Sequence, residues 1–320
     1  MLQATVKSKV VIEGVGVHSG VGCRVSILPA SENCGVVYVL GDTTETAAIG
    51  SCASDVGDSG GVRANYANVS DTTLCTRLGY GKVGVSMVEH LSAALYGCGV
   101  SNAVLCVCGG EVPILDGSAA VIVEKVLAAG VQWQRESRKK LKIIQTVKVE
   151  EEGRWAMLSP SDAFLLHMTC DFSSKGLTTQ PFLHEFSSER FITEVAPART
   201  FGFLTDREFY QRHALAQGVS PENTIIFDKN GLPLTRSQVT KALARSSSAF
   251  GIANDTVTEA ATDLRFSDEP VRHKVLDAVG DLSLAECEII GRYDGFCSGH
   301  RLNNLVLRKL FADSRNFLVT

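Results

Sequence analysis

Hydrophobic positions along the chain follow two spacings, one typical of β-strands and one typical of α-helices. Apolar runs bounded by turn-forming residues predict strands at residues 5–12, 23–28, 35–40, 69–76, 103–107, 141–149, 163–170, 223–228, 288–292 and 304–307. Apolar residues three or four apart predict helices at residues 87–96, 119–129, 206–216 and from about 267 or 268 to 281. Both kinds of element occur in each part of the chain, which predicts two β/α halves.

A stretch without apolar periodicity, residues 132–140, separates the two packed halves. The chain has 320 residues, which is enough for two domains of ordinary size. We therefore predict an N-terminal β/α domain at residues 1–132 and a C-terminal β/α domain at residues 133–320. Two segments lack a clear pattern: residues 41–65 are polar and predict a loop, and the Ala-, Ser- and Thr-rich residues 232–263 predict no single element.

The predicted helix that begins near residue 267 has a polar face with groups that can hold a metal ion. With His273 at zero on a helical wheel, Asp277 lies at about 40° and Asp281 at about 80°. An apolar stripe lies on the other side, between about 140° and 240°, and consists of Val271, Val275, Ala278, Val279 and Leu282. An imidazole and a carboxylate one turn apart can bind one metal ion. The alternative is a surface helix that carries these groups by chance, so a metal site needs partners elsewhere.

A second helix start, at residues 86–90, repeats this arrangement. Ser86 and Glu89 have the spacing of a capping box. Like His273, His90 lies near the beginning of its predicted helix and has a glycine seven positions later. Two copies of one β/α unit, each giving a histidine to a shared cleft, would explain the similarity; chance is the alternative.

These residues together form a candidate zinc site. Two histidines and one aspartate, His90, His273 and Asp277, provide three ligands and leave a position open for water, as in catalytic rather than structural zinc sites. Glu89 lies next to a ligand on the same helix and could accept a proton from that water. His300 follows in the second half as a further histidine of the set.

Composition and charge narrow the possible functions. The net charge of −4 offers no positive field for nucleic acid or an anionic membrane surface. The N-terminus lacks a basic segment followed by an apolar run, and no run of about 18 apolar residues occurs, so we expect a cytoplasmic protein without an integral membrane segment. Ten cysteines without a CxxC pair favour reduced thiols. The turn at residues 14–20 lacks the third glycine and the lysine of nucleotide-binding loops.

Seven short motifs lie in order along nearly the whole chain. They are GVGVHSG (14–20), DTTLCT (71–76), VEHL (88–91), EVPILDGSA (111–119), ARTFGF (198–203), VRHKVLDAVGD (271–281) and SGHRLN (298–303). Together they resemble the zinc-dependent UDP-3-O-acyl-N-acetylglucosamine deacetylases of lipid A biosynthesis. One departure is the run GVSPEN at residues 218–223, where that family usually has a turn like GGSLDN.

The resemblance implies roles for the residues of the candidate zinc site. His90, His273 and Asp277 match the zinc ligands of the family, and Glu89 matches its general base. His300 matches the histidine that acts as general acid or electrostatic partner for the departing amine. Such a site is chemically coherent, because zinc makes hydroxide available near neutral pH and an amide nitrogen must be protonated before it leaves.

The resemblance also implies supporting residues. Asp281 matches the aspartate that orients the catalytic histidine, and Thr200 matches the threonine that hydrogen-bonds the developing oxyanion. Lys274 matches the lysine that contacts the substrate diphosphate, and Phe201 and Phe203 lie where the family lines its substrate and acyl-chain passage. The alternatives are a turn or capping role for Thr200, a solvated helix lysine at Lys274, and ordinary core packing for the two phenylalanines.

For the whole chain, the resemblance implies an α+β fold of two similar domains that form a layered sandwich. Helices are expected between the two sheets, with the active site at the domain junction. The implied reaction is zinc-dependent hydrolysis of the N-acetyl group of UDP-3-O-acyl-N-acetylglucosamine to UDP-3-O-acyl-glucosamine and acetate, the committed step of lipid A biosynthesis. The expected protein is a cytoplasmic monomer that binds this UDP-linked acylated amino sugar and no nucleic acid. Alternatives are a zinc amidase for another sugar or nucleotide-sugar and a lipid- or sugar-nucleotide-binding protein without activity.

Overall fold

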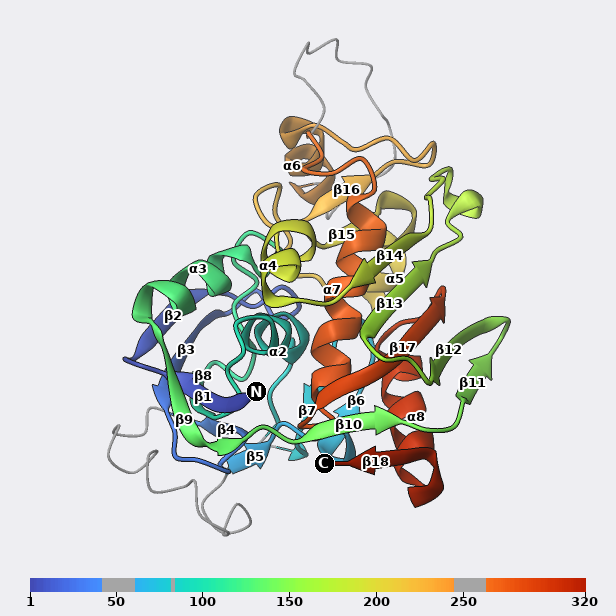
Figure 1. Ribbon diagram of the computed structural model, residues 1–320. Helices are drawn as coiled ribbons and strands as arrows, with labels where there is room; N and C mark the ends of the chain where they lie inside the picture. Colours follow the sequence, from blue (N-terminus) through green and yellow to red (C-terminus); the bar gives the residue numbers. More distant parts are fainter. Residues whose placement is uncertain (42–60, 82–83, 245–262) are drawn as a thin grey trace.

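A computed structural model describes residues 1–41, 61–81, 84–244 and 263–320 of the chain (Figure 1). The strands of the first half are β1 (Leu2–Val6), β2 (Val10–Val15), β3 (Gly22–Pro29), β4 (Val36–Leu40), β5 (Gly61–Arg63), β6 (Val69–Asp71), β7 (Arg77–Leu78), β8 (Ala103–Cys108) and β9 (Val131–Ser137). Those of the second half are β10 (Lys140–Ile143), β11 (Val147–Glu151), β12 (Arg154–Ser159), β13 (Phe164–Thr169), β14 (Phe182–Glu185), β15 (Phe201–Phe203), β16 (Ile225–Phe227), β17 (Glu288–Phe296) and β18 (Phe317–Val319). The α-helices are α2 (Val88–Gly97), α3 (Ala120–Ala129), α4 (Ser188–Arg190), α5 (Arg207–Arg212), α6 (Arg236–Ala244), α7 (Glu269–Ser283) and α8 (His300–Phe311).

Two large sheets form the frame of the protein. The first has the strand order β2-β3-β8-β4-β5, and the second has the order β11-β12-β17-β10-β18, with β13 also paired to β17 and β14 to β13. In Figure 1, α2 and α7 lie between the two sheets, and α8 lies beside the second one. This arrangement of sheets and helices confirms the predicted α+β class.

The first sheet is built around β8, which pairs antiparallel with β3 and parallel with β4. Its continuous apolar run is buried at every residue except the last, as expected for a strand covered on both faces. The predicted strands at residues 23–28 and 103–107 are therefore confirmed. The run predicted as one strand at residues 5–12 forms two strands instead, because the polar residues 7–9 are exposed and break it.

The stretch for which the sequence predicts a domain boundary contains a strand. β9 pairs antiparallel with β1, with Val131 opposite Val6. Most side chains of β9 are polar and exposed, so the strand leaves no apolar alternation in the sequence. One hydrophobic core includes residues of both halves, such as Leu91 and Leu276. The division into residues 1–132 and 133–320 remains a prediction.

The second sheet is built around β17. This strand pairs parallel with β10 and β13 and antiparallel with β12. The predicted strand at residues 288–292 is thus confirmed and extends to Phe296. The run predicted as one strand at residues 141–149 forms β10 and β11, which are separated by an exposed break at residues 144–146.

The strand predicted at residues 304–307 is wrong, because these residues lie inside α8. The buried side chains of α8 include Leu302, Val306, Leu307 and Leu310, which have the three- to four-residue spacing of a helix. The window of four residues was too short to distinguish this spacing from a strand.

The central layer is formed by α2 and α7, which approach each other very closely. A Cβ atom on Gly280 would lie 2.1 Å from the carbonyl oxygen of Glu89, so only glycine allows this contact. The rings of His90 and His273 meet edge to face, with centroids 4.9 Å apart. The two helix starts that look alike in the sequence therefore do bring their histidines to one place.

Helix α7 is buried on both of its faces. Its apolar stripe faces the core, and its polar residues His273, Asp277 and Asp281 are only 2 to 4% exposed. The helix begins after Asp268 and has Pro270 in its first turn, as the sequence predicts. The alternative of a surface helix with a chance polar face is therefore wrong.

The glycine-punctuated turn at residues 14–20 wraps around the carboxylate of Glu111. The backbone N–H groups of His18 and Ser19 donate to this carboxylate at 2.9 and 3.0 Å. A Cβ atom on Gly16 would lie 2.1 Å from one of its oxygens. The N–H groups of residues 18 and 19, which a phosphate-binding loop would offer to a ligand, are therefore engaged internally by Glu111.

Within the described ranges, no helix is both long and apolar enough to cross a membrane. The cysteines of the described ranges form no disulfide. The two segments without a clear sequence pattern are described in part. The first contributes β5 and the second contributes α6, and residues 42–60 and 245–262 lie outside the described residues.

Candidate metal centre and active site

The three predicted metal ligands come together where α2 meets α7. Nε2 of His90 lies 3.6 Å from Oδ1 of Asp277, and Nε2 of His273 lies 3.4 Å from the same oxygen. All three residues are buried, and their ligand atoms lie within 4.8 Å of one another. Oδ1 of Asp277 is buried and has no hydrogen-bond partner among the described residues. Buried polar atoms are nearly always paired, so this set of two nitrogens and one oxygen fits a divalent cation.

The surroundings of these ligands favour the protonation states that metal binding needs. Nδ1 of His273 lies 3.0 Å from the carbonyl oxygen of Ala198. Because a carbonyl only accepts, Nδ1 carries the proton and Nε2 keeps its lone pair for a metal. Burial lowers the pKa of His273 to about 4, against the opposing charge of Asp277. Burial alone would raise the pKa of Asp277, but the adjacent imidazoles and the Lys274 ammonium hold it well below its usual range.

Glu89 lies beside the ligands and is only 2% exposed. Its Oε2 accepts a hydrogen bond from the backbone N–H of Thr76 at 3.0 Å, and its Oε1 lies 3.8 Å from Nε2 of His300. Burial raises the pKa of Glu89, against the opposing effects of His300 and His90. A glutamate with a raised pKa is a stronger base than an ordinary one, so this carboxylate is suited to accept a proton.

The predicted capping box at the start of α2 is wrong. The helix begins after Met87, which has a left-handed conformation with φ 61°, and no side chain caps it. The hydroxyl of Ser86 instead accepts a hydrogen bond from Arg77 at 2.9 Å. Glu89 binds the backbone of Thr76 rather than its own helix terminus. Met87 is thus a non-glycine residue in the left-handed region directly before α2, and the carboxylate of Glu89 does not serve as a helix cap.

His300 and Asp281 form a buried ion pair next to Glu89. Nδ1 of His300 donates to Oδ2 of Asp281 at 2.9 Å. Burial would lower the pKa of His300, but the carboxylates of Asp281 and Glu89 outweigh it and raise this pKa to about 9. His300 is therefore a cation at neutral pH, with Nε2 directed to Glu89.

Two further residues hold Asp281 and were not singled out in the sequence. The hydroxyl of Thr76 donates to Oδ1 of Asp281 at 2.5 Å, and the side-chain amide of Asn303 donates to Oδ2 at 2.8 Å. Both residues lie in motifs noted above, but threonine and asparagine are too common for their type to indicate a role. Their function depends on contacts between distant segments.

A pocket of about 600 Å³ opens next to this cluster. It is lined by Glu89, His90, Thr200, His273, Asp277 and His300. Apolar residues also line it, including Phe201, Phe203, Leu204, Leu215, Ile226 and Val239. One pocket thus combines the polar cluster with a large apolar surface, a combination that suits a ligand with a polar reacting group and an apolar chain.

The predicted residues Phe201 and Phe203 on β15, and Thr200 directly before this strand, border the pocket. The backbone of Thr200 is fixed by two hydrogen bonds, from its N–H to Gly117 at 2.7 Å and from Ile225 to its carbonyl at 3.0 Å. The ring of Phe201 lies 6.3 Å from the ring of His273, centroid to centroid. Phe203 lines the pocket and also belongs to a small hydrophobic cluster with Ile225 and Phe227. Its position therefore agrees both with a role in lining the pocket and with core packing.

Lys274 lies near the second carboxylate oxygen of Asp277, Oδ2, whereas the two histidines lie near Oδ1. Its Nζ is 3.5 Å from Oδ2 of Asp277, and its side chain is 17% exposed. It is therefore not a solvated helix lysine. It does not line the pocket formed by the described residues, and its proposed contact with a diphosphate remains a prediction.

His18 is a pocket residue that is not among the predicted site residues. Its side chain lines the pocket, and both ring nitrogens are buried without a hydrogen-bond partner among the described residues. Burial lowers its pKa, against the opposing charge of Glu111. Its place in the GVGVHSG motif was the available signal.

The fold and the buried His, His, Asp set define an α+β protein with a candidate metal centre. The family model described as UDP-3-O-acyl N-acetylglycosamine deacetylase matches residues 3–245 and 233–312. A UDP-3-O-acyl-N-acetylglucosamine deacetylase from Psychrobacter sp. (strain PRwf-1) is 34% identical over 319 residues, covering 99% of this chain and 94% of the relative. The deacetylases of the same name from Pasteurella multocida (strain Pm70) and Haemophilus influenzae (strain PittEE) are each 36% identical over 314 residues. Each match covers 97% of this chain and 90% of the relative. The chain belongs to the UDP-3-O-acyl N-acetylglycosamine deacetylase family.

Proposed function

We propose that the protein is a zinc-dependent deacetylase, a metalloamidase that hydrolyses the N-acetyl group of UDP-3-O-acyl-N-acetylglucosamine. The products are UDP-3-O-acyl-glucosamine and acetate, and the reaction is the committed step of lipid A biosynthesis. The observation that carries this proposal is the buried, unpartnered oxygen of Asp277 between two histidines, beside Glu89 and His300. The names of the relatives support the substrate.

His90, His273 and Asp277 are the residues that would hold the metal. Their two nitrogens and one oxygen are the ligand types of catalytic zinc, which leaves a further position open. When bound, zinc acts as a Lewis acid that polarises the amide carbonyl and makes water nucleophilic near neutral pH.

Glu89 is the proposed general base. As the water oxygen forms its bond to the acetyl carbon, the water proton passes to Glu89. Oε2 is already held by the N–H of Thr76, which fixes the carboxylate and leaves Oε1 to take the proton. Thr200, at the pocket wall, is proposed to donate a hydrogen bond to the developing oxyanion.

His300 is the proposed general acid. When the C–N bond breaks, the nitrogen must receive a proton, because an amide anion is a very poor leaving group. The pKa of about 9 keeps His300 protonated at neutral pH, and Asp281 holds its ring through Nδ1. The histidine can thus protonate the amine while Glu89 holds the proton taken from water.

The remaining assignments concern the substrate and the cell. We propose that Lys274 contacts the diphosphate and that Phe201 and Phe203 line the passage for the acyl chain. Residues 1–132 would supply Glu89 and His90 as one domain, and residues 133–320 would supply the rest. The enzyme is proposed to act as a cytoplasmic monomer.

Acetate release from UDP-3-O-acyl-N-acetylglucosamine tests this proposal. The zinc-loaded protein is expected to release acetate, and Glu89→Gln is expected to lose activity by a factor of about 10² to 10⁴ while it still binds zinc. An inactive zinc-loaded protein, or a fully active Glu89→Gln variant, would contradict it. Equal rates on the N-acetyl sugar without UDP would favour a zinc amidase for other sugars.

A further inference from the structure

We propose that Glu269 is a positioning residue of the metal centre, because through Arg199 it fixes the backbone segment that orients His273 and Thr200. The inference rests on the proposed function, since it assigns Glu269 to the same site. No sequence motif pointed to this residue.

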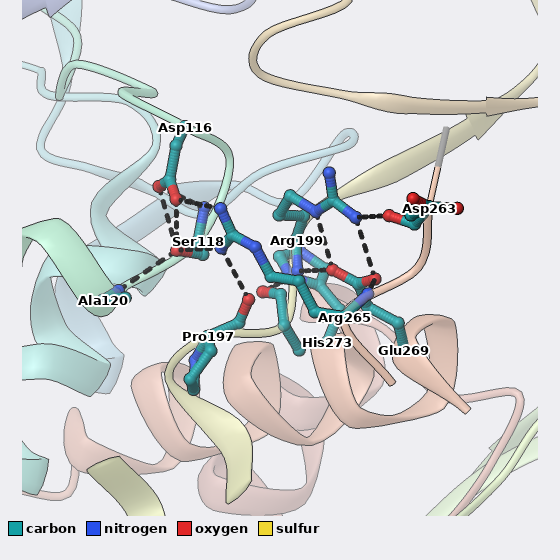
Figure 2. A network of polar contacts seen from close by, with 10 residues as sticks. Asp116, Ser118, Ala120, Pro197, Arg199, Asp263, Arg265, Glu269 and His273 are labelled. Carbon is teal, nitrogen blue, oxygen red and sulfur yellow. Dashed lines mark hydrogen bonds and ion pairs between the residues drawn. The ribbon is translucent and has the colours of Figure 1, made fainter. Parts of the chain in front are cut away.

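The carboxylate of Glu269 belongs to the polar network in Figure 2, where it lies beside Arg199. The residue is fully buried at the first position of α7. Its Oε1 accepts hydrogen bonds from the backbone N–H and Nε of Arg199 at 2.9 and 2.8 Å. Its Oε2 accepts from Nη2 of Arg199 at 3.1 Å and from the backbone N–H of Arg265 at 2.7 Å. The carboxylate therefore fixes the main chain at residue 199 as well as the guanidinium.

Arg199 lies between two residues that reach the site. The carbonyl of Ala198 accepts the Nδ1 proton of His273 at 3.0 Å, and this contact sets the ring of that histidine. Thr200, on the other side, lines the pocket. A shift of the backbone at residue 199 would displace both contacts together. Glu269 lies one helical turn before His273 on α7. The same helix therefore carries the proposed metal ligand and the carboxylate that holds Arg199.

A second arginine holds the same segment from its other end. Arg265 donates from Nη1 to the carbonyl of Pro197 at 2.9 Å and from Nη2 to Asp116 at 2.8 Å. Figure 2 shows the two arginines next to each other, with Asp116 and Glu269 on either side. The residues around Ala198 are thus held by two buried or partly buried arginine–carboxylate pairs.

The charge of Glu269 is needed for this arrangement. The side chain of Arg199 is only 13% exposed, so its cation depends on the carboxylate. Glu269→Gln keeps the size of the side chain, but its NH₂ group would face an N–H donor. Loss of an outer contact that orients a ligating histidine commonly weakens metal binding by about 10- to 100-fold.

Binding of cobalt(II) to the metal-free protein tests the proposal without use of the deacetylase reaction. The visible absorption of bound Co²⁺ reports both affinity and ligand geometry. We expect Glu269→Gln to raise the Co²⁺ dissociation constant by about tenfold or more and to change the absorption bands. Arg199→Lys keeps the charge but loses the two-pronged contact, so a smaller increase is expected. Asp313→Asn, which breaks an exposed arginine–carboxylate pair, is the matched control and should bind as wild type.

Circular dichroism shows whether each variant is folded. If Glu269→Gln does not fold, the more conservative variants Glu269→Asp and Arg199→Lys replace it in the test. Both are expected to raise the Co²⁺ dissociation constant and to change the absorption bands. Wild-type affinity and an unchanged Co²⁺ spectrum in the folded variants would overturn the proposal. A wild-type protein that binds no Co²⁺ would instead contradict the proposed metal-dependent function, so the two failures are distinguishable.

Discussion

Replacement of Asp281 by asparagine is expected to lower the pKa of His300 without a change in the shape of the site. Asp281 is 2% exposed, and its Oδ2 lies 2.9 Å from Nδ1 of His300. Burial disfavours the cation, and the carboxylates of Asp281 and Glu89 bring the pKa of His300 to about 9. Removal of one opposite charge at this distance changes a pKa by about 1–3 units. This shift corresponds to about 1.4–4 kcal/mol of interaction free energy.

A histidine NMR titration of the metal-free protein measures this pKa directly, and a His300→Gln variant identifies the resonance. The wild-type pKa is expected near 9 and that of Asp281→Asn about 1–3 units lower. Asp294→Asn removes the carboxylate 3.1 Å from His167 and should leave His300 unchanged. An unchanged pKa in Asp281→Asn, or a wild-type value below 6.5, would refute the reasoning.

The same substitution has consequences for stability and rate. The pKa of His300 is higher in the folded protein than in the unfolded chain, so protonated His300 stabilises the fold. This stabilisation is fully present below pH 6.5 and is lost as the pH rises through about 9. Asp281→Asn should therefore destabilise the metal-free protein most below pH 6.5. Protonated His300 is the proposed acid, so the alkaline decline in rate should move to lower pH in the variant. The positive charge of bound zinc would lower the pKa of His300 in the wild-type protein and in Asp281→Asn alike. The difference in this pKa between the two proteins is expected to remain.

Two further substitutions test packing and substrate binding. Gly280→Ala places a Cβ 2.1 Å from the carbonyl oxygen of Glu89, so urea unfolding should show a loss of about 1–3 kcal/mol or more. Gly22→Ala is the control, because nothing lies within 4 Å of the added atom. Lys274→Met removes a charge proposed to contact the diphosphate, so KM should rise about 10- to 100-fold; an effect confined to kcat would contradict that assignment.

The candidate metal-binding face of α7 could be predicted because it depends on one helix. His273 and Asp277 are four residues apart, and helical geometry alone places them on one face. That Glu89 and His90 join this face depends on the packing of α2 against α7, which no local spacing specifies. The ordered motifs supplied that link.

Contacts between distant segments account for what the sequence did not reveal. Thr76 and Asn303 lie more than 200 and 20 residues from Asp281 in sequence, with hydrogen bonds that only the folded chain creates. Glu269 looks like an ordinary acidic residue at a helix start, but the fold buries it completely against Arg199. The strand wrongly expected at residues 304–307 shows the opposite difficulty, since a short apolar run fits either type of element.

The central claim is that His90, His273 and Asp277 bind zinc. Diffraction from crystals of the zinc-loaded protein, collected on both sides of the zinc absorption edge, tests it most directly. We expect one strong anomalous peak at about 2.0–2.2 Å from Nε2 of both histidines and from the carboxylate of Asp277. A peak bound by other residues, or no peak in crystals of a protein that releases acetate, would contradict the claim.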